Sequence, residues 1–276
     1  MFKKIFFLFL ILFPAGLSAQ IVVSGVTGDS GFVAVRGALY YKANEDLTII
    51  PMYSYYKNTD ESPSINGFGL RAEYQPGRIA WGVEGGYVPP SNGYLNYSAG
   101  ADAKYYIIGR THELVEMLYA GLGATFIRHE QRPGFPDIFG NTIPDYTLNE
   151  TRASLLAGVT VKPVLISSVF SKSFFSQTPP VVSNIWIDTP YFVTINSSFL
   201  DYFWNTYAVL PLDPFDVHGA YSLAKDYWGG SPYQSASFGA TIKVMGIAWT
   251  GNVEFRDLGT SNARTYYSLS GNLYFP

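Results

Sequence analysis

The stretch I-N-G-F-G-L-R-A-E-Y-Q, residues 65–75, alternates apolar and polar side chains with a period of two. Its apolar face carries Phe68, Leu70, Ala72 and Tyr74. Its other face carries small and polar residues, namely Gly67, Gly69, Arg71, Glu73 and Gln75. Because successive side chains of a β-strand point to opposite faces, this pattern predicts a strand with one apolar and one polar face.

The same alternation recurs along most of the chain. It is found around 79–88, 94–107, 150–161, 235–244, 247–256 and 266–275. These segments are about ten to fourteen residues long, whereas strands of globular proteins usually have ~5–6 residues. A tilted strand that spans a bilayer needs ~9–11 residues, so their length favours membrane-spanning strands over a soluble sandwich.

The apolar faces are built of whole Leu, Val, Phe, Tyr, Trp and Ala side chains, which places them against lipid and the polar faces inside. An open sheet in hydrocarbon would leave the N–H and C=O groups of its edges without hydrogen bonds, so the sheet must close. The 17% aromatic content suits strands whose ends lie at a membrane interface. The sequence therefore predicts an all-β fold, a transmembrane antiparallel up-and-down β-barrel.

The N-terminus has the pattern of an export signal. M-F-K-K is followed by nine apolar residues and then by P-A-G-L-S-A-Q, which predicts a signal peptide over 1–19, cleaved between Ala19 and Gln20. An uncleaved membrane anchor is the alternative, but the apolar run is well short of the ~20 residues of a spanning helix. We expect 20–276 to form a single barrel domain, and the absence of cysteine excludes a disulfide framework.

The C-terminal segment Y-Y-S-L-S-G-N-L-Y-F-P, residues 266–276, shows the same alternation. It places Tyr267, Leu269, Gly271, Leu273 and Phe275 on one face. Such a last strand, ending in an aromatic residue, resembles that of bacterial outer-membrane β-barrel proteins, and the resemblance covers nearly the whole mature chain. It implies a location in the outer membrane, contact with its lipid, and recognition of these five residues by the barrel assembly machinery. Pro276, which follows Phe275, departs from that pattern.

Counting strands back from the C-terminus gives about twelve, since such barrels have an even number with both termini periplasmic. Ten and fourteen stay open, because the stretch 177–232 has room for another hairpin. A segment this long without the alternation of apolar and polar residues is uncommon in a compact domain, and its aromatic content argues against disorder. We interpret 177–232 as a long folded extracellular loop. Its candidate binding residues are Trp186, Tyr202, Trp204 and Tyr207.

The inward faces supply charges of both signs. The candidate lumen-lining residues are Arg36, Arg71, Glu73, Glu84, Asp102, Lys104, Glu150, Arg152, Lys243, Glu254, Arg256 and Arg264. Facing rows of opposite charge would orient polar solutes in a narrow channel, whereas pairing between neighbouring strands would plug the barrel. The predicted function is therefore passive passage of small polar solutes. The alternative is a plugged structural or surface-binding barrel that acts through its aromatic outer loop.

An enzyme is a third, less favoured hypothesis. The chain has three histidines, and Asp216-Val217-His218 resembles the Asp-x-His pair of the omptin proteases, without a second acidic pair to match it. His112 is expected in a periplasmic turn and His129 at an outer strand end. Paired histidine or cysteine ligands and phosphate-binding glycine loops are absent from the sequence, so neither a metal nor a cofactor is expected. The net charge of -3 gives no reason to expect a nucleic-acid partner.

Overall fold

The computed structural model describes residues 19–28, 31–57, 64–108, 115–135, 142–180, 199–229, 231–258 and 263–275. Fourteen strands run through these residues. They are β1 (Ala19–Gly28), β2 (Val33–Lys42), β3 (Leu47–Lys57), β4 (Ile65–Tyr74), β5 (Ile79–Ser91), β6 (Tyr94–Ile108), β7 (Val115–Gln131), β8 (Tyr146–Val161), β9 (Val164–Phe175), β10 (Leu200–Leu212), β11 (Phe215–Asp226), β12 (Tyr233–Val244), β13 (Ile247–Arg256) and β14 (Arg264–Phe275). None of the described segments is a helix that is long and apolar enough to cross a membrane.

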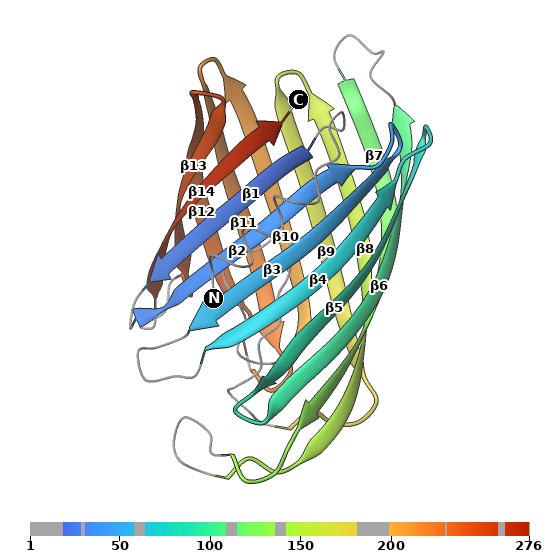
Figure 1. The fold of residues 1–276 in the computed structure, drawn as a ribbon, viewed down its shortest axis with the longest axis vertical. Coiled ribbons are helices and arrows are strands. Elements are labelled where there is room, and N and C mark those ends of the chain that lie inside the picture. Colours follow the sequence, from blue (N-terminus) through green and yellow to red (C-terminus); the bar gives the residue numbers. More distant parts are fainter. Residues whose placement is uncertain are drawn as a thin grey trace.

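The strands form one closed antiparallel barrel in which each strand pairs with its neighbours in sequence. The barrel closes where β1 pairs with β14, from Ala19 opposite Phe275 to Gly28 opposite Tyr266. The strands are strongly tilted against the long axis of the barrel (Figure 1). Closure gives every strand two partners, which removes the edges that lipid could not hydrogen-bond.

The prediction of about twelve strands is wrong, and the alternative of fourteen is confirmed. The two additional strands are β10 and β11, which form a hairpin inside the segment 177–232. That segment is therefore not a single long extracellular loop. Its prolines suggested a loop, but Pro211 lies near the end of β10 and Pro214 lies in the tight turn to β11, where a missing N–H is tolerated. The predicted signal peptide lies outside the described residues except for Ala19, which begins β1.

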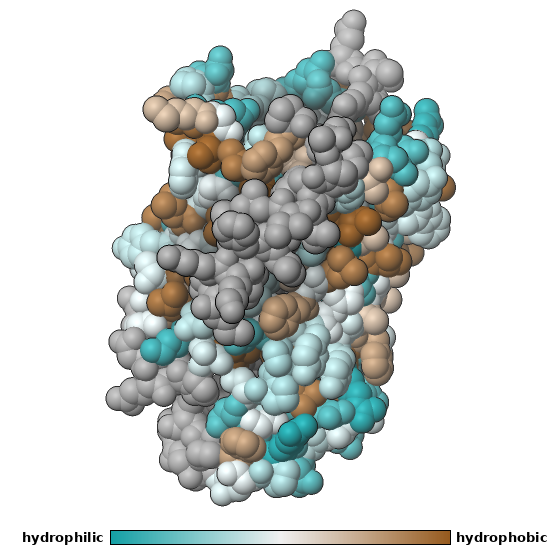
Figure 2. Space-filling view, viewed as in Figure 1, coloured by the Kyte–Doolittle hydropathy of each residue, from teal (hydrophilic) through white to brown (hydrophobic). Residues whose placement is uncertain are grey.

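The two faces of the wall differ as the alternation predicts. Large apolar side chains are most exposed on the outside, for example Leu122 (65%), Phe238 (63%) and Leu269 (58%). In the view of Figure 2, hydrophobic residues lie over the upper and middle parts of the wall, teal residues lie along the upper rim, and the lower end is mostly pale to teal. An apolar outer band flanked by more polar ends is the surface that a bilayer requires.

The two ends of the barrel differ in their connections. At one end, called here the short-turn end, the start of β1 at Ala19 and the end of β14 at Phe275 lie beside tight turns such as Lys162-Pro163, Asp213-Pro214 and Met245-Gly246. At the other, called the long-loop end, the connections include 132–145 and 176–199, and β7 and β8 extend furthest (Figure 1). In outer-membrane barrels short turns are periplasmic and longer loops extracellular, so the long-loop end is expected to face outward.

Three apolar clusters fill part of the interior near the long-loop end. The first comprises Val26, Phe32, Ala34, Tyr56, Ile65 and Tyr266. The second comprises Tyr94, Leu148 and Phe199, and the third Val169, Leu200, Phe203 and Ala224. The inward faces are therefore not uniformly small and charged as the sequence suggested. Burial of these side chains against one another supplies packing that a purely polar interior would lack.

Candidate functional site: the barrel lumen

Arg71 is the centre of a charged cluster on the lumen wall. Its Nε donates to Glu73 Oε1 at 2.7 Å, Nη1 donates to Glu84 Oε2 at 3.2 Å and Nη2 donates to Asp102 Oδ2 at 2.6 Å. The four side chains come from β4, β5 and β6. One guanidinium thus contacts three carboxylates, and charge-assisted bonds of this kind fix both geometry and orientation.

Gly82 makes the reach from β4 to β6 geometrically feasible. It lies on β5, opposite Glu73 on one side and Asp102 on the other. A Cβ atom at this position would lie 2.2 Å from Arg71 Nη2 and 2.5 Å from Asp102 Oδ2. Because glycine leaves this space free, the guanidinium can pass over β5 to the carboxylate on the next strand.

The cluster borders two cavities in the lumen. The larger has a volume of about 470 Å³ and lies against the inward faces of β1–β7. The smaller, of about 130 Å³, lies against Asp102, Thr125, Arg152 and Phe203, among others. Arg71 and Glu84 line both cavities, so their side chains lie at the boundary between them.

The lining of the larger cavity is more apolar on β1–β3, and its carboxylates lie on β4–β7. The inward residues of β1, β2 and β3 contribute the apolar side chains Val22, Ala38, Ile50 and Met52, together with Ser24, Arg36, Tyr40 and Ser54. The inward residues of β4–β7 contribute Arg71, Glu73, Glu84, Asn96, Ser98 and His129. Gly67, Gly69 and Gly86 line the cavity as well, and their missing side chains leave the space open between the two walls.

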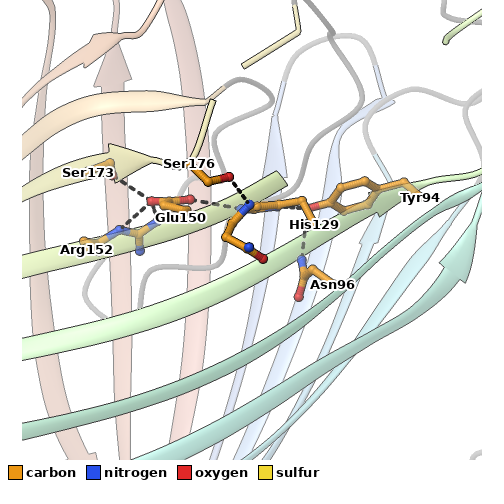
Figure 3. Close-up of polar contacts among 8 residues, drawn as sticks. Tyr94, Asn96, His129, Glu150, Arg152, Ser173 and Ser176 are labelled. Carbon is orange, nitrogen blue, oxygen red and sulfur yellow. Dashed lines mark hydrogen bonds and ion pairs between the residues drawn. The ribbon is translucent and has the colours of Figure 1, made fainter. Parts of the chain in front are cut away.

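A second polar network lies on β6–β9, toward the long-loop end (Figure 3). Glu150 is fully buried and accepts hydrogen bonds from Arg152 Nη2 at 2.8 Å and from Ser173 Oγ at 2.7 Å. Its other oxygen lies 3.0 Å from His129 Nε2, and His129 Nδ1 lies 2.7 Å from the Tyr94 hydroxyl. Asn96 Nδ2 donates to that hydroxyl at 3.1 Å.

These bonds form a chain in one direction. If Asn96 donates to Tyr94, the Tyr94 hydroxyl can donate to His129 Nδ1, and His129 Nε2–H can donate to Glu150. A neutral imidazole protonated at Nε2 satisfies every step. The Phe199 ring packs edge-on against the His129 ring, with centroids 5.1 Å apart, and shields the network from solvent. Full satisfaction and burial are typical of a rigid structural network in the wall.

The strand register places the predicted charged residues on the inward face. The structure brings two groups of them together, Arg71 with Glu73, Glu84 and Asp102, and Glu150 with Arg152. Arg256 lies over the Tyr233 ring at 5.0 Å from its centroid. Arg36 donates from Nε to the Tyr56 hydroxyl at 3.4 Å. Lys104 and Lys243 lie toward the short-turn end, whereas Glu254 and Arg264 lie toward the long-loop end.

Three of the four candidate loop residues lie in a strand and not in a loop. Tyr202, Trp204 and Tyr207 belong to β10, and Trp186 lies outside the described residues. Trp204 is on the outer face, where its Nε1 donates to Ser168 Oγ at 2.8 Å. Tyr202 packs beside Phe170 on the same face, and Tyr207 points inward beside His218. The structure therefore separates these aromatic residues between the two faces of one strand.

The Asp-x-His pair also lies in a strand. Asp216 and His218 are inward residues of β11, and His218 Nε2 is bonded to the amide oxygen of Asn252 on β13. In the omptin arrangement a carboxylate orients the histidine, so this contact gives the protease hypothesis no support. His129 lies near the long-loop end of β7 as expected, and His112 lies outside the described residues.

Sequence reasoning missed two direct partners of Glu150, namely Ser173 and His129, and missed Tyr94 and Asn96, which extend the network from His129. For Tyr94 and Asn96 the available signal was strand phase, because both have the same inward phase as Asp102 on β6. His129 and Ser173 had no such signal, because the charged residues Arg128 and Lys172 on their strands have the opposite phase. The apolar lumen residues Ile50 and Met52 were missed too, since the β3 sequence is apolar on both faces.

No protein-family model matches the chain, and no curated protein matches it. Solved structures do match. CdiB from Acinetobacter baumannii aligns with a TM-score of 0.55 at 7% identity over 94% of this chain, and the chain spans only 60% of the length of CdiB. The CymD monoaromatic hydrocarbon channel aligns with a TM-score of 0.53 at 9% identity, over 96% of this chain and 90% of CymD.

The chain has the fold of a bacterial outer-membrane β-barrel. At identities this low the comparison shows the fold alone. Within this outer-membrane barrel, β14 is the strand that closes the sheet, and Tyr267, Leu269, Gly271, Leu273 and Phe275 all lie on its outer face. The predicted assembly residues therefore form the lipid-facing side of the closing strand. Their recognition by an assembly machinery stays a prediction.

Proposed function

We propose that this outer-membrane barrel is a narrow channel for the passive passage of small solutes. The observation that carries the proposal is the incompletely filled lumen, which keeps a cavity of about 470 Å³ and a second of about 130 Å³ on either side of Arg71 and Glu84. Barrels of about eight strands are just filled by their side chains, and those of 16–18 enclose an aqueous channel. Fourteen strands fall between these limits, which is consistent with a narrow passage.

The Arg71 cluster would be the selective section of this channel. Its charges are held in place by three hydrogen bonds, so a passing solute meets a fixed electrostatic field. Charged side chains around a constriction set ion preference in channels. CymD, which is a channel for monoaromatic hydrocarbons, shows that a barrel with this fold can conduct small molecules.

A structural barrel is the alternative, and the three apolar clusters near the long-loop end favour it. They pack Phe32 and Tyr266, Tyr94 and Phe199, and Leu200 and Phe203 against inward residues. If these clusters seal the lumen, the barrel would serve as a membrane scaffold. In either case we propose that the protein resides in the outer membrane, that lipid contacts the outer face of its wall, and that the barrel assembly machinery recognises β14.

Solute uptake by liposomes tests the channel. Purified folded protein in liposomes should accelerate uptake of a pentose above the rate of empty liposomes. Gly69→Leu should slow this uptake several-fold, because the new side chain enters the large cavity, where the nearest atom is the flexible Met52 Cε at 3.0 Å from the added Cβ. Gly251→Leu is the matched control, since a Cβ there meets nothing within 4 Å on the outer face. Equal uptake with and without protein would contradict the proposal.

A further inference from the structure

We propose that the larger cavity binds a small amphipathic organic cation. Its apolar part would lie against the β1–β3 wall, and its cationic group would lie beside Glu73 and Glu84. The inference rests on the proposed channel function, because it names the class of solute that the lumen accepts. The cavity of about 470 Å³ lies within the ~300–1,000 Å³ that small-molecule pockets usually occupy.

The β1–β3 wall is the first observation. Val22, Ala38, Ile50 and Met52 line the cavity from three adjacent strands. The outward faces of the same strands are largely apolar as well, so this part of the wall carries apolar side chains on both faces, beside the inward polar residues Ser24, Arg36 and Ser54. A lumen that held only water would gain nothing from apolar side chains on both faces. Contact between this wall and the apolar part of a solute would stabilise the bound solute, because burial of apolar surface is favourable.

The charges opposite this wall are the second observation. The cluster holds one arginine and three carboxylates, which leaves it with a net charge of two negative units when all four groups are ionised. The Arg71 side chain is only 14% exposed, whereas those of Glu73 and Glu84 are 45% and 28% exposed. A solute in the cavity therefore meets carboxylate oxygens more readily than the guanidinium.

Arg36, the other arginine of the cavity, is also engaged by the protein. Its Nε contacts the Tyr56 hydroxyl, and its guanidinium carbon lies 5.8 Å from the centre of the Tyr56 ring. Both arginines are thus held by side chains of the wall, and Glu73 and Glu84 are the more exposed charges of the Arg71 cluster. An apolar surface on one side and accessible carboxylates on the other complement an amphipathic cation, and not an anion.

Three probes with the same six-carbon chain test the inference: hexylammonium, hexanol and hexanoate. Their binding to the folded protein in detergent micelles is measured by calorimetry, against a blank of empty micelles. We expect hexylammonium to bind most tightly and hexanoate least. Glu73→Gln should weaken hexylammonium roughly two- to fivefold and leave hexanol unchanged. Met52→Gln, which keeps the side-chain length but adds an amide, should weaken both hexylammonium and hexanol.

The control is Glu130→Gln, which removes a carboxylate from the outer face of β7 and should leave all three affinities unchanged. Hexanoate binding as tightly as hexylammonium, or hexylammonium unaffected by Glu73→Gln, would overturn the inference. The result is separable from the channel proposal. If the protein binds hexylammonium most tightly but takes up no solute, the channel proposal is contradicted and the binding site is supported. If the protein takes up solute but does not prefer hexylammonium, the binding site is contradicted and the channel proposal is supported.

Discussion

At the scale of single residues, Glu150 offers the sharpest test of what holds the wall together. Its carboxylate is fully buried and contacts Arg152, Ser173 and His129. Glu150→Gln keeps the shape but removes the charge, which leaves the Arg152 guanidinium, itself 8% exposed, without its carboxylate partner. Breaking a buried ion pair in this way typically costs about 3–5 kcal/mol. We expect a loss of stability of that order, measured as a lower midpoint of urea unfolding in detergent.

Glu130→Gln makes the same chemical change in an ion pair that faces outward. Arg128 Nε and Glu130 Oε1 are 2.7 Å apart, but their side chains are 51% and 31% exposed. Exposed pairs contribute about 0–1 kcal/mol, so the midpoint should hardly move. If the two variants unfolded at the same urea concentration, the buried network would not be a source of stability.

The sequence predicted which face each charged residue occupies, but not which residues meet. Period two fixes the phase of Arg71, Glu84 and Asp102 on their own strands. Their contact depends on the register between three strands and on the empty position at Gly82, and a slip of one residue would turn each of them to lipid. Register between strands is set by the whole barrel and cannot be read from one segment.

At the scale of elements, the β10–β11 hairpin carries the difference between twelve and fourteen strands. Because the chain has no cysteine, single cysteines with a spin label can be placed along β10 one at a time. Labels at 204, 206 and 208 should collide with oxygen dissolved in lipid, and labels at 203, 205 and 207 should be protected from it. The alternation follows from the inward contact of Asn205 with Ser222 and the outward contact of Trp204 with Ser168.

Leu70→Cys and Gly69→Cys on β4 are the reference pair, since that strand alternates clearly both in sequence and in structure. If the labels at all six β10 positions were equally exposed to a water-soluble relaxation agent, the interpretation as an extracellular loop would be supported and the hairpin would be contradicted.

The hairpin was missed because β10 and β11 contain residues that locally suggest a loop. Pro211 and Pro214 lie within four residues of each other, and both suggest a break. The inward residues Phe203 and Tyr207 are as large and aromatic as the outward Trp204, so the two faces differ little in polarity. Alternation identifies a strand only where its two faces meet different surroundings, and part of this interior is apolar.

At the scale of the whole molecule, length and period were enough to predict a closed antiparallel barrel, because lipid forbids an open sheet. The interior was harder to predict. Fourteen strands enclose more space than the inward side chains fill, and the remaining volume lies beside the Arg71 cluster. Whether that volume connects the two ends of the barrel decides between a channel and a scaffold.

Conductance in a planar bilayer measures that connection directly. The folded protein should give steady single-channel currents, and Met52→Ala should increase them by shortening a side chain that lines the cavity, whereas Leu70→Ala on the outer face should not. Steady current with this pattern is the result expected of a lumen that passes small solutes beside Arg71. A folded, heat-modifiable protein that inserts into the bilayer but conducts no current, in the wild type and in Met52→Ala alike, would contradict the proposed channel.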